Sequence, residues 1–464
     1  MPDAPRHDGP AVPALLDTPR AVHVLAVGGS AMSGIATVLV TMGHRVSGSD
    51  LRDSPRLDAV RAAGIKVSIG HDAAQLPDDT GLVVFSAAIG VDNPELVAAR
   101  ERGLPTWTRT EALQAFAARR RTVAVAGSHG KTTTTAMLTL ALREAGWDPS
   151  HFVGGDVPSL GATAAWRAGE WLVVEADESD GTFLHLGAEA AVVTSVEPDH
   201  LSHYGSIPAL EAAFADFLAS VPGPRLVAAD DPVAARLAAL TSGTTTYGFG
   251  DADYRICRYT PTDFGSSFDL EHRGRSLGSI ELPVPGRHNA ANAAAATAML
   301  VELGAPYDAA QRALRAYTGV ARRFELRGTR DGVTYVDDYA HLPTEVAAMI
   351  DAGREGPWGR VVAVFQPHRY SRTASLWRDF ADAFTDADLV VLTDVYAFDE
   401  PPIDGVSGRL VLRAVLDAHP DLPVVYLPTR ADLVAQVPRL VRSGDLVLTL
   451  GAGDLTTLPD EWVA

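Results

Sequence analysis

The stretch TVAVAGSHGKTTTT, residues 122–135, indicates the fold of this chain more clearly than any other segment. An apolar run ends at Gly127, and a turn rich in glycine and hydroxyl side chains leads to Lys131. This order predicts a buried strand, a turn whose backbone N–H groups hold phosphate, and a helix. Only two of the chain's 39 lysine and arginine residues are lysines. The use of lysine at this position therefore indicates a compact ammonium directed at phosphate rather than a solvated surface cation.

The turn is a short form of the common phosphate-binding pattern. That pattern has a further glycine five residues before Gly130, where this chain has Val125. We expect Lys131 to contact β- and γ-phosphate oxygens, and the Thr132 hydroxyl to bind Mg²⁺. The residues of this turn expected at ATP are Gly127, Ser128, His129, Gly130, Lys131, Thr132 and Thr133.

Acidic side chains follow two further strands that the sequence predicts, within residues 171–178 and 191–200. The carboxyl ends of parallel strands meet at one edge of a sheet, so these acids and the lysine turn should share that edge. Mg²⁺ takes few protein ligands, mostly oxygen, which makes Glu175 the expected carboxylate ligand beside Thr132. His200 is a candidate ligand of a second ion, and the alternative for it is a hydrogen-bonded core residue.

The same order of strand, turn and helix occurs before and after this region. Residues 21–34 join an apolar run to a turn rich in glycine and serine, and a second predicted strand ends in Asp50. Such a turn holds a dinucleotide, another diphosphate or nothing, so alone it is weak evidence. In the last third, predicted strands end in polar clusters at 337–341 and 366–370.

These segments predict an α/β fold with three domains, because 464 residues are too many for one core. We expect a disordered tail at 1–20 and a Rossmann-like N-terminal domain at 21–118. A central P-loop ATP-binding domain at 119–320 and a C-terminal Rossmann-like domain at 321–464 follow.

Composition excludes several classes of function. A net charge of −19 argues against non-specific nucleic-acid binding. No apolar run approaches the ~20 residues that span a bilayer. One cysteine, Cys257, leaves no disulfide and no disulfide-linked partner. The first 20 residues lack the features of a signal peptide, so we expect a cytoplasmic protein.

Several stretches together resemble the Mur ligase family of peptidoglycan synthesis. They lie at 127–135, 175–180, 197–200, 285–289, 322–325, 337–341 and 365–373, and the resemblance runs from about residue 21 to the end. It implies a UDP-sugar domain, a central ATPase and a C-terminal domain that brings the amino acid. The implied reaction uses ATP, with two Mg²⁺ ions expected, to activate the lactyl carboxylate of UDP-N-acetylmuramic acid as an acyl phosphate. The amine of L-alanine then attacks the acyl carbon to form an amide.

The resemblance also implies roles for single residues. Asn292, Arg323 and Asp338 are expected at ATP, and the amino-acid side is expected to hold Tyr339, His341, His368, Arg369 and Arg372. The catalytic set implied is Lys131, Glu175, His200, His341 and Arg323. A histidine near its ordinary pKa can accept the ammonium proton, and the sequence leaves open which one does so.

In the first domain, position at strand ends and turns predicts the contacts of the UDP-sugar. These are Ser30, Met32, Ser33, Ser49, Asp50, Ser86 and Arg109.

The chain departs from the family pattern in places. Ala26 and Ala31 stand where the first turn usually has glycine, and alanine fits only where φ is negative, so a rearranged turn is expected. Ser195, Ser202 and Leu342 replace the usual asparagine, aspartate and histidine. Some relatives hold the second magnesium with a carbamylated lysine, but the central segment has no lysine besides the one in the turn, so we predict none.

Three other functions fit part of the sequence. A ligase of the same family that reattaches recycled peptides shares most motifs and differs mainly in the amino-acid pocket. An NAD-dependent dehydrogenase built on the first strand and turn leaves the lysine turn unused. A non-catalytic nucleotide-binding regulator leaves the metal and substrate residues unused.

Overall fold

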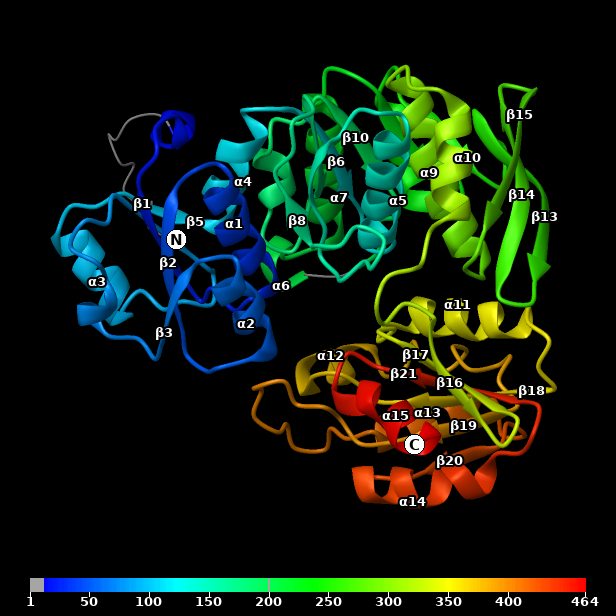
Figure 1. Ribbon diagram of the computed structural model, residues 1–464. Helices are drawn as coiled ribbons and strands as arrows, with labels where there is room; N and C mark the ends of the chain where they lie inside the picture. The colour runs from blue at the N-terminus through cyan, green and yellow to red at the C-terminus, as the bar shows by residue number, and fades with distance from the viewer. Residues whose placement is uncertain (1–11, 199–200) are drawn as a thin grey trace. The chain divides into compact units, whose positions relative to one another are not determined.

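The computed structural model describes residues 12–198 and 201–464 and is shown in Figure 1. Residues 1–11 of the predicted tail lie outside the described residues. Val12–Leu16 form the 3-10 helix η1, in which Leu15 and Leu16 are buried, so this part of the predicted tail is structured.

The first sheet is parallel and has the strand order β3-β2-β1-β4-β5. Its strands are β1 (Ala21–Leu25), β2 (Arg45–Asp50), β3 (Lys66–Ile69), β4 (Leu82–Phe85) and β5 (Thr106–Thr108). The helical segments between and after them are α1 (Ser30–Thr41), α2 (Pro55–Ala62), η2 (Ala73–Gln75), α3 (Pro94–Glu101) and α4 (Arg109–Ala117). The strand order reverses between β1 and β4, which is where a doubly wound sheet binds its ligand.

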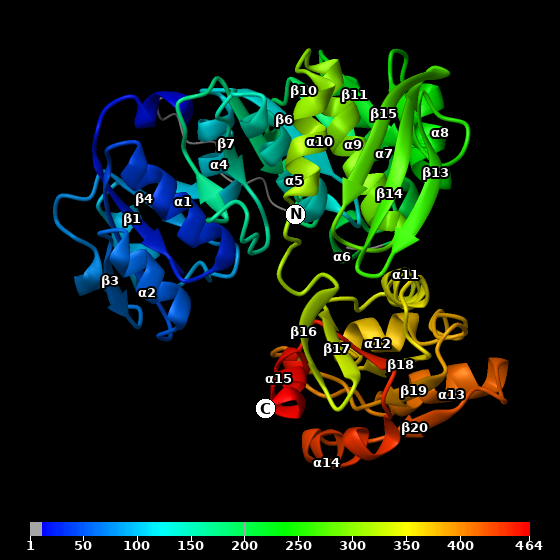
Figure 2. The same ribbon diagram turned by 45° about the vertical axis from the view of Figure 1, so that its right-hand side comes forward.

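The second sheet has ten strands in the order β15-β14-β13-β12-β11-β10-β6-β9-β7-β8. The strand that precedes the lysine turn, β6 (Arg121–Ala126), pairs in parallel with β9 (Trp171–Glu175) and β10 (Ala190–Val193). The carboxyl ends of these three strands therefore meet, as the sequence predicted. Strands β13 to β15 form one edge of the sheet (Figure 2).

Further strands and helices complete the region around this sheet. The strands are β7 (Ser150–Phe152), β8 (Ala164–Ala165), β11 (Arg225–Ala228), β12 (Thr245–Gly248), β13 (Tyr254–Thr262), β14 (Gly265–His272) and β15 (Arg275–Leu282). The helices are α5 (Lys131–Glu144), η3 (Thr182–His185), α6 (Leu201–Tyr204), α7 (Ile207–Ser220), α8 (Pro232–Leu240), α9 (Arg287–Glu302) and α10 (Tyr307–Arg315).

The third sheet has the order β16-β17-β21-β18-β19-β20, parallel except for the β16–β17 pair. Its strands are β16 (Glu325–Arg330), β17 (Val333–Asp338), β18 (Arg360–Phe365), β19 (Leu389–Leu392), β20 (Val424–Tyr426) and β21 (Asp445–Leu450). Its helices are α11 (Pro343–Arg354), α12 (Tyr370–Leu376), α13 (Arg409–Ala418), α14 (Arg430–Leu440), η4 (Asp454–Thr457) and α15 (Leu458–Val463).

This third sheet is buried on both faces. Along β18, Val361 and Ala363 pack with α11 and α13, whereas Val362 and Val364 pack with α14 and α15. A central parallel strand that is covered on both sides needs a continuous apolar run, and β18 has the sequence Arg-Val-Val-Ala-Val-Phe. The same reasoning predicted the buried strands from the sequence.

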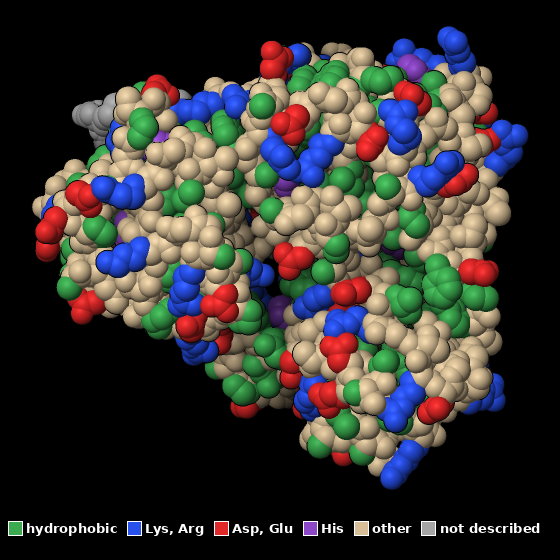
Figure 3. All heavy atoms as spheres, viewed as in Figure 1, with side chains coloured by type: hydrophobic (Ala, Val, Ile, Leu, Met, Phe, Trp, Pro, Cys, Tyr) green, Lys and Arg blue, Asp and Glu red, His purple; other side chains and the backbone are tan. Residues whose placement is uncertain are grey.

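The chain divides into two compact units. One comprises residues up to Arg255 with 272–275 and 292–313, and the other comprises 256–271, 276–291 and 314–464. Within the described residues, no helix is both long and apolar enough to cross a bilayer. On the face shown in Figure 3, arginine and acidic side chains lie interspersed.

Candidate active site

The turn after β6 has a backbone that only glycine fits. Gly127 and Gly130 have φ values of 128° and 77°. A Cβ at Gly127 would lie 2.2 Å from the Thr194 hydroxyl oxygen, and one at Gly130 would lie 2.3 Å from the Asn292 side-chain oxygen. The two glycines let the turn pack closely against its neighbours and lead directly into α5, whose first N–H groups are available to an anion.

Lys131 lies at the start of α5 as a buried cation surrounded by oxygen. Its Nζ donates to the Gly127 carbonyl at 2.6 Å and to a Glu178 carboxylate oxygen at 2.9 Å. Burial alone would lower the pKa of Lys131, but Glu178 and Glu175 outweigh it and hold the pKa above its ordinary value. The ammonium therefore stays charged, as binding of phosphate requires.

Glu178 was not assigned a role from the sequence, although it belongs to the acidic stretch after β9. It is the direct partner of Lys131, and its side chain is only 3% exposed. The signal that identifies it is its position three residues after Glu175 at the same strand end.

Thr132 and Glu175 form the oxygen pair expected for a metal. The Thr132 hydroxyl donates to Glu175 Oε1 at 3.0 Å, and the Gly154 amide donates to Glu175 Oε2 at 2.6 Å. Among the described residues no group of three or more His, Cys, Asp or Glu side chains is arranged to hold a metal. Mg²⁺ commonly takes one or two carboxylates and completes its shell with water and substrate phosphate, so this pair fits it. His200, predicted as a further ligand, lies outside the described residues.

The rest of the turn is tied to the end of β10. Ser195, which replaces the usual asparagine, accepts a hydrogen bond from His129 N on its Oγ and one from Ser128 N on its carbonyl, both at 3.0 Å. His129 Nε2 lies 3.2 Å from a Glu197 carboxylate oxygen. Thr133 is buried.

Asn292, expected at the adenine side of ATP, lies beside the same turn. Its side-chain oxygen accepts a hydrogen bond from the buried Thr134 hydroxyl at 3.2 Å. The structure thus brings this predicted residue to the glycine turn, within one compact unit.

The predicted UDP-sugar residues do not all lie together. Asp50 accepts a hydrogen bond from Gly28 N at 2.9 Å, and Ser33 donates to the Ser30 carbonyl at 2.9 Å, so these lie at the turn between β1 and α1. Met32 is buried in the first helix turn. Ser49, by contrast, is fully buried and donates to Glu95 at 2.7 Å.

Ser86 and Arg109 lie elsewhere in the first domain. Ser86 accepts a hydrogen bond from Ala88 N within its own loop at 3.3 Å. Arg109 contacts the acidic stretch after β9, with Nη2 at 3.2 Å from Asp177 and 2.6 Å from Asp180. Arg109 lies at the start of α4, and its acidic partners could not be predicted from the sequence.

The expectation that Ala26 requires a negative φ is wrong. Ala26 has a φ of 58° and occupies the left-handed region that glycine normally fills. An L-residue there costs about 1–2 kcal/mol, which the surrounding turn sustains. Ala31 lies inside helix α1.

In the second unit, Asp338 is a buried anchor of the loop after β17. Its carboxylate accepts hydrogen bonds from Phe324 N and Ala340 N, both at 2.7 Å. Burial raises the pKa of Asp338 to about 6. The guanidinium of Arg323 lies 5.5 Å from the ring centre of Tyr339 and 3.7 Å from Glu345.

Two histidines of the predicted amino-acid side lie next to one another. The ring centres of His341 and His368 are 5.7 Å apart. His341 Nδ1 lies 3.0 Å from the Tyr339 carbonyl and 3.2 Å from Glu345, and His368 Nδ1 accepts from Arg372 Nη1 at 3.0 Å. Burial lowers the pKa of both, and His341 and Arg372 help bring that of His368 to about 4. Both rings are therefore neutral near pH 7.

Residues that sequence reasoning missed complete this cluster. The Tyr396 ring stacks on His368 at 5.9 Å, and the Arg369 guanidinium lies 4.7 Å from the Phe398 ring. Both aromatic residues come from the loop after β19. The polar residues Thr393 and Asp394 at that strand end are the sequence signal that could have drawn attention to this loop.

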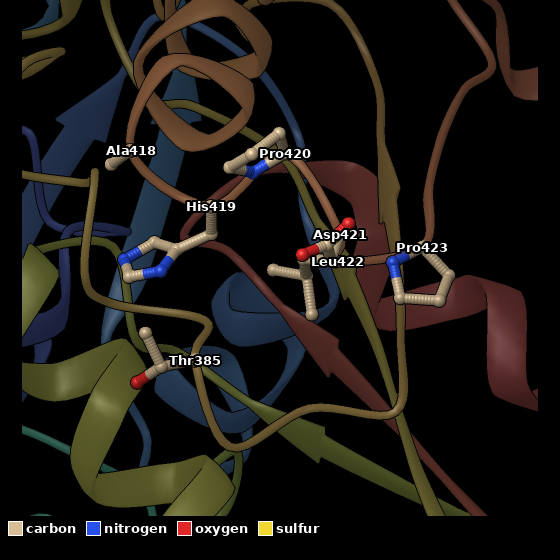
Figure 4. A pocket seen from close by; sticks show the side chains of 7 residues that line it. All are labelled: Thr385, Ala418, His419, Pro420, Asp421, Leu422 and Pro423. Atoms are coloured by element: carbon tan, nitrogen blue, oxygen red, sulfur yellow. The ribbon is translucent and has the colours of Figure 1, made fainter.

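A surface pocket of about 410 Å³ lies away from these residues (Figure 4). It is lined by Thr385, Ala418, His419, Pro420, Asp421, Leu422 and Pro423. Thr385 and Pro423 precede β19 and β20, so the pocket is at the amino ends of the strands. Ligands of such sheets bind at the carboxyl ends, and we assign this pocket no ligand.

Three family models match successive parts of the chain. They are described as "Mur ligase family, catalytic domain" at residues 21–121, "Mur ligase middle domain" at 125–300 and "Mur ligase, glutamate ligase domain" at 322–453. The prediction of three α/β domains is confirmed by these matches together with the three sheets.

Named relatives and solved structures agree with the family models. The UDP-N-acetylmuramate–L-alanine ligase of Bradyrhizobium diazoefficiens is 45% identical over 446 residues, which are 94% of this chain and 95% of that protein. The crystal structure of a UDP-N-acetylmuramate-alanine ligase from Thermotoga maritima matches with a TM-score of 0.80 at 27% identity, covering 96% and 98% of the two chains.

A MurF ligase of Thermotoga maritima, solved with ADP, has a TM-score of 0.60 at 16% identity, covers 90% and 92% of the two chains, and shows the fold alone. The matches of the family models and the identity over nearly the full length leave one conclusion about ancestry: the chain belongs to the Mur ligase family.

Proposed function

We propose that this chain uses ATP to join the lactyl carboxylate of UDP-N-acetylmuramic acid to the amine of L-alanine through an acyl phosphate. The observation that carries this proposal is the buried, charged Lys131 in the glycine turn, beside the Thr132–Glu175 oxygen pair. Relatives that align over nearly the whole chain carry the name of this activity.

In the first step a carboxylate oxygen forms a bond to the γ-phosphorus, and the bond from that phosphorus to the β–γ bridging oxygen breaks to release ADP. Lys131 would lie against the β- and γ-phosphates and neutralise charge that moves onto the leaving ADP. Glu178 accepts a hydrogen bond from the lysine ammonium, which supports a role in holding that side chain in place. Thr132 and Glu175 would hold Mg²⁺, which supplies further charge neutralisation when bound, and His200 remains a proposed ligand of a second ion.

In the second step the amine attacks the acyl carbon, the tetrahedral intermediate collapses, and phosphate leaves. The amine must lose a proton, and the hydrogen bonds of the two histidines point to His341 as its acceptor. His341 Nδ1 faces two acceptors, the Tyr339 carbonyl and Glu345, so this nitrogen carries the hydrogen and Nε2 has the lone pair. His368 has the opposite arrangement, because Arg372 only donates to its Nδ1.

The alanine carboxylate would bind to the arginines of the same cluster, Arg369 and Arg372, because a guanidinium pairs well with a carboxylate. Arg323 and Asp338 remain proposed ATP contacts. For Asp338 the hydrogen bonds to Phe324 N and Ala340 N favour a further role in holding the loop.

We also propose that the protein works in the cytoplasm without binding nucleic acid. The use of ATP and of a nucleotide-linked precursor supports the first point, and the net charge of −19 supports the second.

The test measures phosphate release by the purified protein with ATP, Mg²⁺ and UDP-N-acetylmuramic acid. L-alanine, glycine, L-serine or a tripeptide is added in parallel reactions. We expect turnover that requires an amino acid and is fastest with L-alanine. Turnover only with the peptide would replace this proposal by the peptide-recycling reaction, and turnover without any amine would exclude amide formation.

A further inference from the structure

The loop after β19 carries an exposed aromatic side chain on a strained backbone. Phe398 and the next residue, Asp399, have φ values of 45° and 64°. Steric contacts disfavour this left-handed region for residues with a Cβ, and most of all for bulky ones. Phe398 is nevertheless 51% exposed, so burial in a core does not offset the strain. Strained residues persist only where their surroundings fix them, and they occur often at functional sites.

Hydrogen bonds on both sides of Phe398 tie the loop to the segment after β18. Two residues before Phe398, the Tyr396 carbonyl accepts a hydrogen bond from the Arg369 amide at 2.8 Å. Two residues after it, the Glu400 carboxylate accepts from the Ser371 amide at 2.9 Å and from the Ser371 hydroxyl at 2.7 Å. The chain on each side of Phe398 is therefore anchored, and this holds Phe398 beside the segment after β18.

The Phe398 ring borders residues of the proposed amino-acid site. Its centre lies 5.4 Å from the ring centre of His368 and 4.7 Å from the guanidinium carbon of Arg369. His341, the proposed proton acceptor, has its ring centre 5.7 Å from that of His368. His368 is buried and Tyr396 is partly buried, so Phe398 is the exposed ring beside His368. It offers apolar surface next to side chains that are otherwise polar or charged.

The groups of L-alanine differ in what they need from this site. Its carboxylate is proposed to bind Arg369 and Arg372, and its amine has to reach Nε2 of His341. The substituent that remains on the α-carbon, apart from hydrogen, is the methyl group. Packing of a methyl group on an exposed ring removes apolar surface from water, which is favourable, whereas a charged group would lose hydration there. The exposed face of Phe398 therefore suits the methyl group.

We propose that the Phe398 ring contacts the methyl group of the bound amino acid and limits the size of the side chain that the site accepts. This inference rests on the proposed function and names the residue that selects L-alanine over smaller and larger amino acids. Glycine has no methyl group to pack on the ring. L-2-aminobutyrate is one methylene longer, and the anchored loop keeps the ring from moving aside for it.

Phosphate release with ATP, Mg²⁺ and UDP-N-acetylmuramic acid tests the proposal, with glycine, L-alanine and L-2-aminobutyrate compared by kcat/KM. In the wild type L-alanine should exceed each of the others by about tenfold or more, the usual effect of one methyl or methylene group in an apolar site. Phe398→Ala should lower kcat/KM for L-alanine about tenfold through KM, leave glycine unchanged and raise L-2-aminobutyrate relative to L-alanine. Phe398→Leu, which keeps an apolar side chain, should recover part of the preference over glycine.

The matched control is Phe264→Ala. Phe264 is also 51% exposed, but its ring packs edge-on against Trp358 at 5.7 Å. Trp358 precedes β18 and His368 follows it, so these two aromatic contacts are at opposite ends of that strand. The control should leave kcat/KM unchanged for every amino acid. ADP affinity, measured by calorimetry, should be unchanged in both alanine variants, because neither ring belongs to the glycine turn.

Different outcomes decide the inference and the proposed function. If no amino acid supports turnover by the wild type, or only a tripeptide does, the proposed function fails. If the wild type prefers L-alanine and Phe398→Ala keeps that preference, the inference fails and the proposed function stands. An equal loss with glycine and L-alanine would show that the ring supports His368 or the loop instead of the methyl group, which also overturns the inference. A wild type that uses the amino acids equally well would overturn it too.

Discussion

The turn that holds Lys131 and the cluster that holds His341 and His368 keep buried side chains in opposite charge states. In both regions the charge state follows from burial and from neighbouring charges. Around Lys131, buried carboxylates hold a cation charged, whereas around His341 and His368 burial and neighbouring arginines keep two rings neutral. The difference teaches that protonation follows the balance of burial and charge: carboxylates outweigh burial at Lys131, whereas burial outweighs Glu345 at His341. One region suits anionic phosphate and the other suits removal of a proton from an amine.

The largest effect is expected from Lys131→Arg. A planar guanidinium cannot reproduce the compact ammonium that bonds the Gly127 carbonyl and Glu178. We therefore expect phosphate release to fall about 100- to 1,000-fold with the fold retained. Lys66→Arg is the matched control, because the only other lysine is exposed on β3. Circular dichroism checks the fold of both variants. A rate near wild type for Lys131→Arg would show that phosphate transfer does not need the lysine. The contrast between the two regions would then no longer hold.

The next effect concerns which histidine takes the proton. His341→Gln should lower kcat about 100-fold, a typical loss for a general base. His368→Gln should act mainly on KM for L-alanine, since the Nδ1 of His368 already accepts from Arg372. His419→Gln, in the surface pocket, serves as the control. A larger kcat loss in His368→Gln than in His341→Gln would reverse the assignment.

The neutral state of His368 also predicts a pH effect on stability. Its folded pKa of about 4 lies below the ordinary value of 6.5, so between these values the unfolded chain binds more protons and stability falls as pH falls. His368→Gln lacks this contribution. From pH 7 to pH 5 the wild type should lose roughly 2 kcal/mol more stability than the variant. Thermal unfolding midpoints at both pH values measure this, and parallel shifts in the two proteins would contradict a neutral buried ring.

For each region, the sequence predicted which residue types lie at the ends of which strands. Three buried strands, which end at Ala126, Glu175 and Val193, could be placed at one sheet edge because apolar runs and turns are local signals. Which acid of the stretch after β9 pairs with Lys131 could not be predicted, because Glu178 reaches the lysine through packing between segments distant in sequence. Contacts of this kind depend on tertiary structure rather than on pattern.

The smallest effect is expected from relieving backbone strain in the turn after β1. The turn after β1 has a non-glycine residue, Ala26, at a φ of 58°, where the lysine turn has glycines. Ala26→Gly relieves that strain and should stabilise the first domain by about 1 kcal/mol. Ala31→Gly is the matched control, because it lies in α1 and should destabilise by up to about 1 kcal/mol.

Thermal unfolding of both variants measures these opposite shifts, expected to be about 2–4 °C each. UDP affinity adds a second readout. If Ala26→Gly stabilises the protein and leaves UDP binding unchanged, the strain is tolerated without serving the ligand. If Ala26→Gly weakens UDP binding, the alanine holds the turn after β1 in a geometry that the diphosphate needs. Binding at that turn would then depend on backbone shape, whereas binding at the lysine turn depends on the charge of Lys131.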